Sequence, residues 1–210
     1  ADLIMLSLVH CKYCQNIFLY RETPHFIKQI NSDLNPNELY IININSLAYQ
    51  IALDMNDYKP IDNDSVHILM DDYIFISFIL GNDFIPHHPS VNIRTNGIDI
   101  LLDIYRKHFS YSNTIIHNNT IQWKNVKKLF TILAESERKF LIIEHEKRKK
   151  LENRFYPNQE ADDKLNKLNN LPTICRTKEK YICPENPFWE QRYYETLFDI
   201  SYNQNHIKNI

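Results

Sequence analysis

The residue best suited to chemistry in this 210-residue chain is Asp83, in the segment ILGNDFIPHHPS. It follows a long apolar stretch and Gly81, one of only two glycines in the chain. A carboxylate beside a buried helix is costly to desolvate unless it binds a cation or accepts several hydrogen bonds. Asp83 is therefore either a metal ligand or a capping residue that accepts from the backbone amides of Phe84 and Ile85.

Three further carboxylates are candidates for the same chemistry. Asp2 stands at the entrance to an apolar segment, as a cap or a ligand would. Asp71 and Asp72 lie in the middle of a predicted helix, where they face either a polar cleft or solvent. None of these three carboxylates indicates the function by itself.

The four cysteines offer a different chemistry. Cys11 and Cys14 have C-x2-C spacing beside His10, but Cys175 and Cys183 are too far apart for the usual second half of a zinc site. Free intracellular thiols are the alternative, because no secretory signal precedes them.

A basic run at 144–154, EHEKRKKLENR, could meet phosphate groups through Lys147, Arg148, Lys149 and Lys150. The intervening glutamates also fit a solvated helix face. The sequence leaves both interpretations open.

The elements that must position these side chains are mostly helical. Residues 1–9 form a buried strand or a short helix, and 16–22 and 38–44 are predicted strands, rich in β-branched and aromatic residues. Helices are predicted at 47–55 after Asn45 and Ser46, at 66–80 after Asp64 or Ser65, from Asn96 and Gly97 onward, and at 125–155. The second half of the 66–80 helix is apolar nearly all round, which predicts burial on most sides and a buried position for Asn82 and Asp83 beyond it. The scarce Gly81 and Gly97 are expected where a side chain is excluded.

The amino-acid composition does not indicate a binding partner. The net charge of -2 gives no global basic signature, and 43% hydrophobic residues exclude a disordered chain. There is no stretch of 18 apolar residues and no charged leader, so we expect an intracellular protein, cytoplasmic or nuclear, without a membrane partner. The 29 Ile and 24 Asn residues fit AT-rich coding, as in a large DNA virus or an AT-rich protist.

Three segments together resemble a known family. Residues 71–109, with a double Asp, an apolar helix, GNDF and a Pro-His-x-Pro turn, resemble the block that closes the catalytic region of XRN-type 5′→3′ exoribonucleases. The opening ADLIML is similar to the family's DADLIML, and WEQRYYETLFDI resembles the W-x-x-R-Y-Y segment that begins its second conserved region. The matches are collinear along the chain.

The resemblance implies a nuclease related to flap endonucleases and PIN-like domains, which uses Mg²⁺ (or Mn²⁺) to hydrolyse single-stranded RNA from a 5′-monophosphate end. Asp2 matches the second Asp of DAD and Asp83 the Asp of GNDF, both metal ligands in the family. Two cations suit an in-line hydrolysis, one preparing the attacking water and one stabilising the leaving oxygen. Gly81, Asn82 and Asp72 are expected to support the site.

The departures from the family pattern matter equally. The first Asp of DAD would precede Ala1, and the earlier acidic ligands, the 5′-phosphate pocket and the base-stacking aromatic residue are not identifiable here. His88 stands where the family often has a hydrophobic residue. We therefore expect a section of a longer polypeptide that is inactive alone and completes its site with the rest of that polypeptide.

The predicted fold is mostly α with a small α/β remnant at the N-terminus: the C-terminal part of a PIN/flap-nuclease-like catalytic domain plus a buttressing helical domain. The predicted organisation is the end of the α/β core at 1–45, a helical section with GNDF at 46–156, a variable linker or insertion at 157–187 and the start of the second conserved region at 188–210. The rival functions are a degenerate relative that binds RNA without cutting it, a flap-type DNA nuclease, and a zinc-binding interaction domain.

Overall fold

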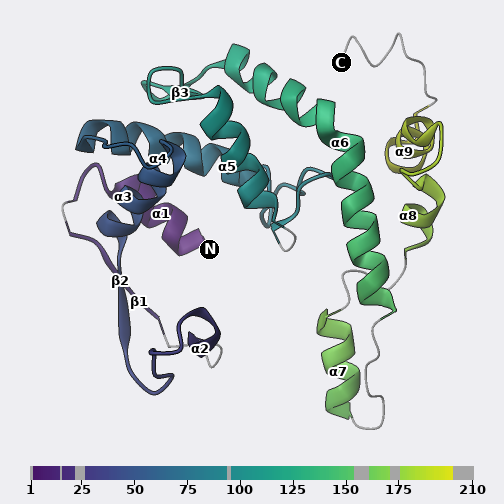
Figure 1. Ribbon diagram of the computed structural model, residues 1–210, viewed down its shortest axis with the longest axis horizontal. Coiled ribbons are helices and arrows are strands. Elements are labelled where there is room, and N and C mark those ends of the chain that lie inside the picture. The colour runs from purple at the N-terminus through teal and green to yellow at the C-terminus, as the bar shows by residue number, and fades with distance from the viewer. Residues whose placement is uncertain are drawn as a thin grey trace. The chain divides into compact units, whose positions relative to one another are not determined.

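The chain is mostly helical, which confirms the predicted fold class. The computed structural model describes residues 2–14, 16–21, 27–93, 96–153, 161–170 and 176–200 (Figure 1). Backbone contacts divide the chain into two compact units, Ala1–Phe130 and Thr131–Ile210. This boundary lies within a long helix.

The first unit contains most of the short elements. They are α1 (Asp2–His10), β1 (Phe18–Arg21), α2 (Ile27–Ile30), β2 (Tyr40–Asn43), α3 (Ile44–Met55), α4 (Asn63–Phe78), α5 (Gly97–His108), β3 (Ile116–His117), β4 (Thr120–Ile121) and the start of α6 (Trp123–Glu152). The segment 1–9, which allowed a strand or a helix, is helical.

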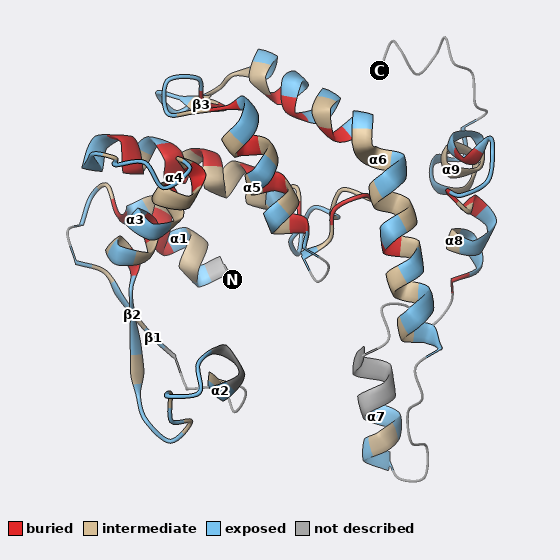
Figure 2. Cartoon of the chain, in the orientation of Figure 1, coloured by how far each residue is buried: buried red, intermediate tan, exposed pale blue. Residues whose placement is uncertain are grey.

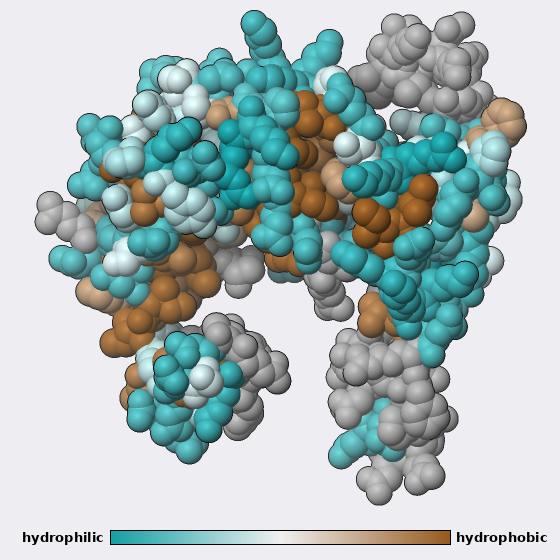
Figure 3. Space-filling model, viewed as in Figure 1, coloured by the Kyte–Doolittle hydropathy of each residue, from teal (hydrophilic) through white to brown (hydrophobic). Residues whose placement is uncertain are grey.

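The two predicted N-terminal strands form one antiparallel hairpin. β1 pairs with β2 in the register Phe18 to Asn43 and Arg21 to Tyr40. Apolar side chains of this hairpin remain exposed, among them Tyr20 and Ile41. Figure 3 shows a hydrophobic area of the surface over this hairpin.

The predicted helices α3 and α4 are confirmed, but each begins a few residues before the predicted cap. The Asn43 side chain accepts a hydrogen bond from the amide of Ser46 at 3.0 Å, and Asp62 accepts from the amide of Ser65 at 2.8 Å. A side-chain oxygen that accepts from the amide three residues onward satisfies a donor left open by the first helical turn. Asn43 and Asp62, rather than Asn45, Asp64 or Ser65, therefore start these helices.

The core of the first unit lies where α3, α4, α5 and the β3 segment meet, as the buried residues in Figure 2 show. Small Ala48 and Ala52 on α3 are fully buried and allow α4 to approach closely. The residues buried around them include Ile44, Met55, Leu69, Met70, Ile76, Leu101, Tyr105 and Ile115.

A short hairpin between α5 and α6 was not predicted. β3 pairs with β4 through Ile116 to Ile121 and His117 to Thr120, so its turn consists of Asn118 and Asn119. Both residues have positive φ, 48° and 58°. Two-residue hairpin turns of this kind favour Asn because its side chain tolerates the left-handed region.

Helices α1 and α4 pack against each other in opposite directions (Figure 1). The Lys12 ammonium, just after α1, lies 3.9 Å from an Asp71 carboxylate oxygen of α4. Asp2 begins α1 before this ion pair, and α4 ends at Phe78 after it. The start of α1 and the end of α4 therefore lie at the same end of this antiparallel helix pair.

The second unit contains the rest of α6 together with α7 (Ala161–Asn170), α8 (Thr177–Ile182) and α9 (Trp189–Phe198). The turn between α8 and α9 is held by two arginines. Arg192 donates to the carbonyls of Ile182, Cys183 and Pro187 at 2.8–3.2 Å, and Arg138 of α6 donates to those of Pro184 and Glu185 at 3.1 and 3.2 Å. Helices α7 and α8 lie in the segment predicted as a linker or insertion, so this segment carries secondary structure.

Candidate functional site

The GNDF loop begins where α4 ends, and its first turn requires glycine. Gly81 has φ +85°, and a Cβ at this position would lie 2.6 Å from the backbone nitrogen of His87. An L side chain would meet both backbone strain and a steric clash. Gly97 is constrained by space alone, because a Cβ there would lie 2.6 Å from the Asn92 carbonyl oxygen. The expectation that both glycines exclude a side chain is confirmed.

Asn82 shapes the loop from within. Its side-chain oxygen accepts hydrogen bonds from the amides of Phe84 and Ile85, both at 2.8 Å, and its own amide donates to the Ile85 carbonyl at 2.8 Å. These are the amides that Asp83 was expected to cap. Asn82 makes this turn instead, which leaves the neighbouring carboxylate uncommitted.

Asp83 and Asn82 are exposed, so the predicted burial of both residues is wrong. The loop projects beyond the end of α4, and Phe84 beside Asp83 is 93% exposed. Among the described residues, none forms a hydrogen bond or ion pair with the Asp83 carboxylate. Both of its oxygens are therefore open to a ligand from outside the described part of the chain.

The base of the loop is fastened to α4 through His88. The His88 amide donates to the Ile79 carbonyl at 2.8 Å, and its Nδ1 lies 2.9 Å from the Ser90 hydroxyl. Burial, followed by the neighbouring His87, lowers the pKa of His88 below its ordinary value. The ring lies 6.0 Å from that of Phe130, so this histidine fills an apolar position as a packing residue.

Asp72 lies in the core, not on a solvated helix face. Its carboxylate is 0% exposed and accepts from the Tyr105 hydroxyl at 2.6 Å and from the amides of Ile115 and Ile116 at 2.8 and 2.6 Å. Desolvation raises the pKa of Asp72, and these hydrogen bonds act in the opposite direction. Asp72 joins α4, α5 and β3, and so holds the helix from which the GNDF loop projects.

The spacing of apolar residues around Asp72 indicates its burial. Leu69, Asp72 and Ile76 follow the i, i+3, i+7 spacing of one helix face, and all three are buried. A carboxylate within an apolar helical stripe needs internal donors, which Tyr105 and the β3 amides supply.

Asp2 begins α1, and its side chain lies outside the described residues. The antiparallel register of α1 and α4 brings the start of α1 to the end of the pair that carries the GNDF loop. The two segments that resemble nuclease metal ligands thus lie at the same end of this helix pair, although they are far apart in the sequence.

Apolar side chains are exposed at the same end of this helix pair. Leu3 and Leu6 of α1, Phe78 of α4 and Phe84 of the loop are 49–93% exposed. The expectation that residues 73–80 are buried on most sides is met only in part: Ile76 and Leu80 are buried, Phe78 is exposed and the others are half-buried. An apolar helix that the described residues cover on one side leaves its other side available for further contacts.

The predicted cysteine site is not assembled among the described residues. Cys11 is buried, with burial raising the pKa of its thiol, and its sulfur lies 3.6 Å from the Ser7 carbonyl. Cys14 is exposed, and Cys175 lies outside the described residues. In the described part of the chain, no group of three or more His, Cys, Asp or Glu residues is arranged to hold a metal ion.

The predicted RNA-contact residues lie on α6 within the second unit. Arg148 pairs with Glu179 of α8 and lies 3.9 Å from Glu144, so its guanidinium is engaged inside the unit. Lys147 also has an interaction within the protein, and Lys150 is exposed. Of the three, only Lys150 is exposed.

Sequence comparison identifies the class of protein. Residues 63–186, more than half of the chain, match the family described as the Xrn1 helical domain, and the chain belongs to that family. The match includes α4, the GNDF loop and the segment up to the turn after α8.

Three curated relatives illustrate the similarity. The chain is 33% identical over 112 residues to 5′-3′ exoribonuclease 2 of Eremothecium gossypii, a match that covers 52% of the chain and 11% of the relative. It is 29% identical over 119 residues to 5′-3′ exoribonuclease 2 of Arabidopsis thaliana, covering 56% and 12%. It is 25% identical over 142 residues to 5′-3′ exoribonuclease 1 of Schizosaccharomyces pombe, covering 65% and 10%. The matches thus cover only about a tenth of each of these relatives, which are fungal and plant proteins and give no support to a viral source.

Among the described helices, none is both long and apolar enough to cross a membrane.

Proposed function

We propose that the polypeptide carrying this chain is a Mg²⁺- or Mn²⁺-dependent 5′→3′ exoribonuclease that degrades single-stranded RNA from a 5′-monophosphate end. The named relatives are 5′-3′ exoribonucleases, and the family match includes the GNDF loop. The observation that carries the proposal is the Asp83 carboxylate, held on a shaped loop and left without a partner among the described residues.

The chemistry of Asp83 fits a hard divalent cation. Mg²⁺ binds carboxylate oxygens and retains several waters, so an exposed carboxylate with both oxygens open is a suitable ligand. The constraint at Gly81 fixes the backbone before Asp83, and the hydrogen bonds from the amides of Phe84 and Ile85 to Asn82 fix the backbone after it. When bound, such ions supply a nucleophilic water and charge stabilisation for phosphodiester hydrolysis.

This chain would supply only part of that centre. Asp83, with Asp2 at the same end of the α1–α4 pair, gives two carboxylates, and further ligands must come from elsewhere in the polypeptide. The exposed apolar residues Leu3, Leu6, Phe78 and Phe84 offer the surface against which that remaining part would pack. Burying such apolar surface is the main favourable term in association of protein parts.

The test is a paired degradation assay on the intact polypeptide with 5′-monophosphorylated and 5′-hydroxyl RNA in Mg²⁺. Asp83→Asn keeps the shape of the side chain and removes its charge. We expect degradation of the 5′-monophosphorylated substrate to fall by about 100-fold or more, because even outer-shell changes at metal sites cost about 10–100-fold. Asp99→Asn, which removes an exposed carboxylate in the first turn of α5, is the matched control and should keep full activity.

Two outcomes would contradict the proposal. If the wild-type polypeptide binds RNA without degrading it, a degenerate RNA-binding relative is the better description. If it cuts branched DNA in preference to RNA ends, it is a flap-type nuclease. Equal activity of Asp83→Asn and wild type would remove Asp83 from the metal site and leave the enzyme class intact.

A further inference from the structure

The second unit contains a polar pocket that the proposed catalytic centre does not use. Its volume is about 310 Å³, and its lining residues come from the C-terminal part of α6 and from α8 with its flanks: His145, Lys149, Glu152, Asn153, Arg176 and Lys180. The lining residues of α6, with Asn153 directly after it, are spaced i, i+4, i+7 and i+8, so they share one face of that helix. The pocket thus lies between α6 and α8, which ion pairs connect.

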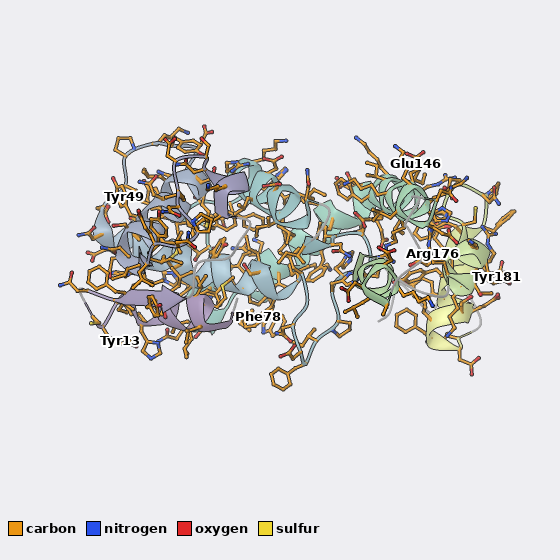
Figure 4. All side chains as sticks on the ribbon, turned by 90° about the horizontal axis from the view of Figure 1, so that it is seen from below. Tyr13, Tyr49, Phe78, Glu146, Arg176 and Tyr181 are labelled. Atoms are coloured by element: carbon orange, nitrogen blue, oxygen red, sulfur yellow. The ribbon has the colours of Figure 1, made fainter. Side chains whose placement is uncertain are left out.

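Arg176 forms the fixed wall of this pocket, between α6 and α8 (Figure 4). Its side chain is only 2% exposed. It donates to Glu179 at 2.7 Å, to Glu152 at 3.0 Å and to the carbonyl of His145 at 3.4 Å. A buried guanidinium with partners on both helices keeps the spacing of the two lining faces constant.

The charge of the lining is unbalanced in favour of cations. Three basic side chains, those of Lys149, Arg176 and Lys180, face a single carboxylate, Glu152. Glu152 is already bound by Arg176 and by Lys180, the latter at 2.8 Å. Lys149 is exposed, and no described residue forms a hydrogen bond or ion pair with its ammonium group. The pocket therefore presents one uncompensated, accessible cation beside donors that are held in place.

We propose that this pocket binds phosphate groups of the single-stranded RNA backbone, with Lys149 and Lys180 as the contacting residues and Arg176 as the positioning residue. The proposal rests on the proposed function for its choice of RNA as the source of phosphate. Backbone phosphates are recognised by lysines as point charges and without regard to base sequence. Of the four basic residues that the sequence offered for phosphate contact, Lys147, Arg148, Lys149 and Lys150, Lys149 is the one that lines the pocket.

The test compares two charge reversals on adjacent residues, Lys149→Glu and Lys150→Glu, in the intact polypeptide. Both variants change the net charge equally and both residues are exposed, but only Lys149 lines the pocket. Fluorescence anisotropy with a labelled 5′-hydroxyl single-stranded RNA, in EDTA, measures binding without catalysis. The same titration at several salt concentrations reports how many phosphates the protein neutralises.

We expect Lys149→Glu to weaken RNA binding by about tenfold. The slope of the logarithm of the binding constant against the logarithm of salt concentration should become shallower by about 0.7 for each phosphate that is no longer neutralised, which is the value for single strands. Lys150→Glu should stay within about twofold of the wild type, since a charge outside the pocket acts only through screened long-range electrostatics. Lys180→Gln should weaken binding less than Lys149→Glu. Circular dichroism of each variant separates a loss of binding from a loss of folding.

Equal effects of Lys149→Glu and Lys150→Glu would overturn the proposal, because they would show a diffuse basic surface. A Lys149-dependent response to inorganic phosphate alone, with unchanged RNA affinity, would overturn RNA as the occupant and identify a small-anion site. Failure of the nuclease proposal is measured separately: RNA binding that depends on Lys149 can persist in a polypeptide that degrades nothing, and degradation can persist when this pocket is irrelevant.

Discussion

Two carboxylates on the same helix–loop segment, Asp72 and Asp83, have opposite environments. Asp72 is 0% exposed and accepts three hydrogen bonds from α5 and from the β3 segment. Asp83 is exposed, and no described residue bonds to its oxygens. One carboxylate is saturated by the fold, and the other is left for a ligand that the described residues do not provide.

The difference follows from the cost of desolvation. A buried carboxylate is tolerated only when internal donors replace water, so a carboxylate with a full set of donors has a structural role. An exposed carboxylate needs no such donors and can exchange water for a cation. Mutation of the two residues should therefore separate stability from activity.

The largest expected effect on stability is that of Asp72→Ala. The variant leaves the Tyr105 hydroxyl and the amides of Ile115 and Ile116 without an acceptor inside the core. Each unsatisfied buried donor costs about 1–3 kcal/mol, so we expect the free energy of unfolding to fall by about 3–5 kcal/mol. Urea denaturation of the 210-residue chain, followed by circular dichroism, measures this change.

Asp71→Ala is the matched control for that experiment. Asp71 is the preceding residue on α4 and forms a 3.9 Å surface pair with Lys12, which should contribute about 0–1 kcal/mol. A similar loss of stability in the two variants would show that the hydrogen bonds of Asp72 are not the source of its effect.

A smaller loss of stability is expected for Tyr105→Phe. This variant removes one donor to Asp72 and leaves the two backbone amides in place, so the free energy of unfolding should fall by about 1–2 kcal/mol. Denaturation in urea checks the magnitude. The same variant should raise the pKa of Asp72 further, because the Tyr105 hydrogen bond lowers it. A carboxyl carbon NMR titration that showed a lower pKa in the variant would contradict this account.

The pH dependence of stability tests the same carboxylate from another direction. Burial raises the pKa of Asp72 above its ordinary value of 3.8. The protonated side chain therefore contributes to the free energy of unfolding below pH 3.8, and this contribution is lost as the pH rises through the folded-state pKa. Asp72→Asn cannot ionise and lacks this loss. The stability of Asp72→Asn relative to wild type should therefore improve as the pH rises above 3.8. A relative stability that declined over this range would show that the fold prefers the ionised form.

The sequence predicted the elements of the fold better than the surroundings of these two residues. Hydrophobic periodicity and the position of Gly81 correctly predicted α4 and the turn after it. The partners of Asp72 could not be found in this way, because they come from α5 and β3, which are adjacent only after folding. The exposure of Asp83 was not predicted, because the apolar helix before it indicated burial, whereas the loop projects beyond the end of that helix.

A local effect is expected for Asn82→Ala. The Asn82 side chain accepts from the amides of Phe84 and Ile85, and removing a side-chain acceptor of this kind costs about 1 kcal/mol, as at helix caps. Hydrogen exchange of these two amides should accelerate by about fivefold to tenfold, with little change in global unfolding. If exchange is unaffected, the turn is held by Gly81 and His88 without the help of Asn82.

The smallest effect on stability should come from Asp83→Asn, the variant with the largest expected effect on activity. Asp83 has no partner among the described residues, so the free energy of unfolding of the 210-residue chain should change by less than about 0.5 kcal/mol. Denaturation in urea without divalent ions is the measurement. A loss comparable to that of Asp72→Ala would mean that Asp83 is a structural residue after all. A small loss, combined with a large fall in nuclease activity of the intact polypeptide, would show that the loop carries a carboxylate that folding does not require.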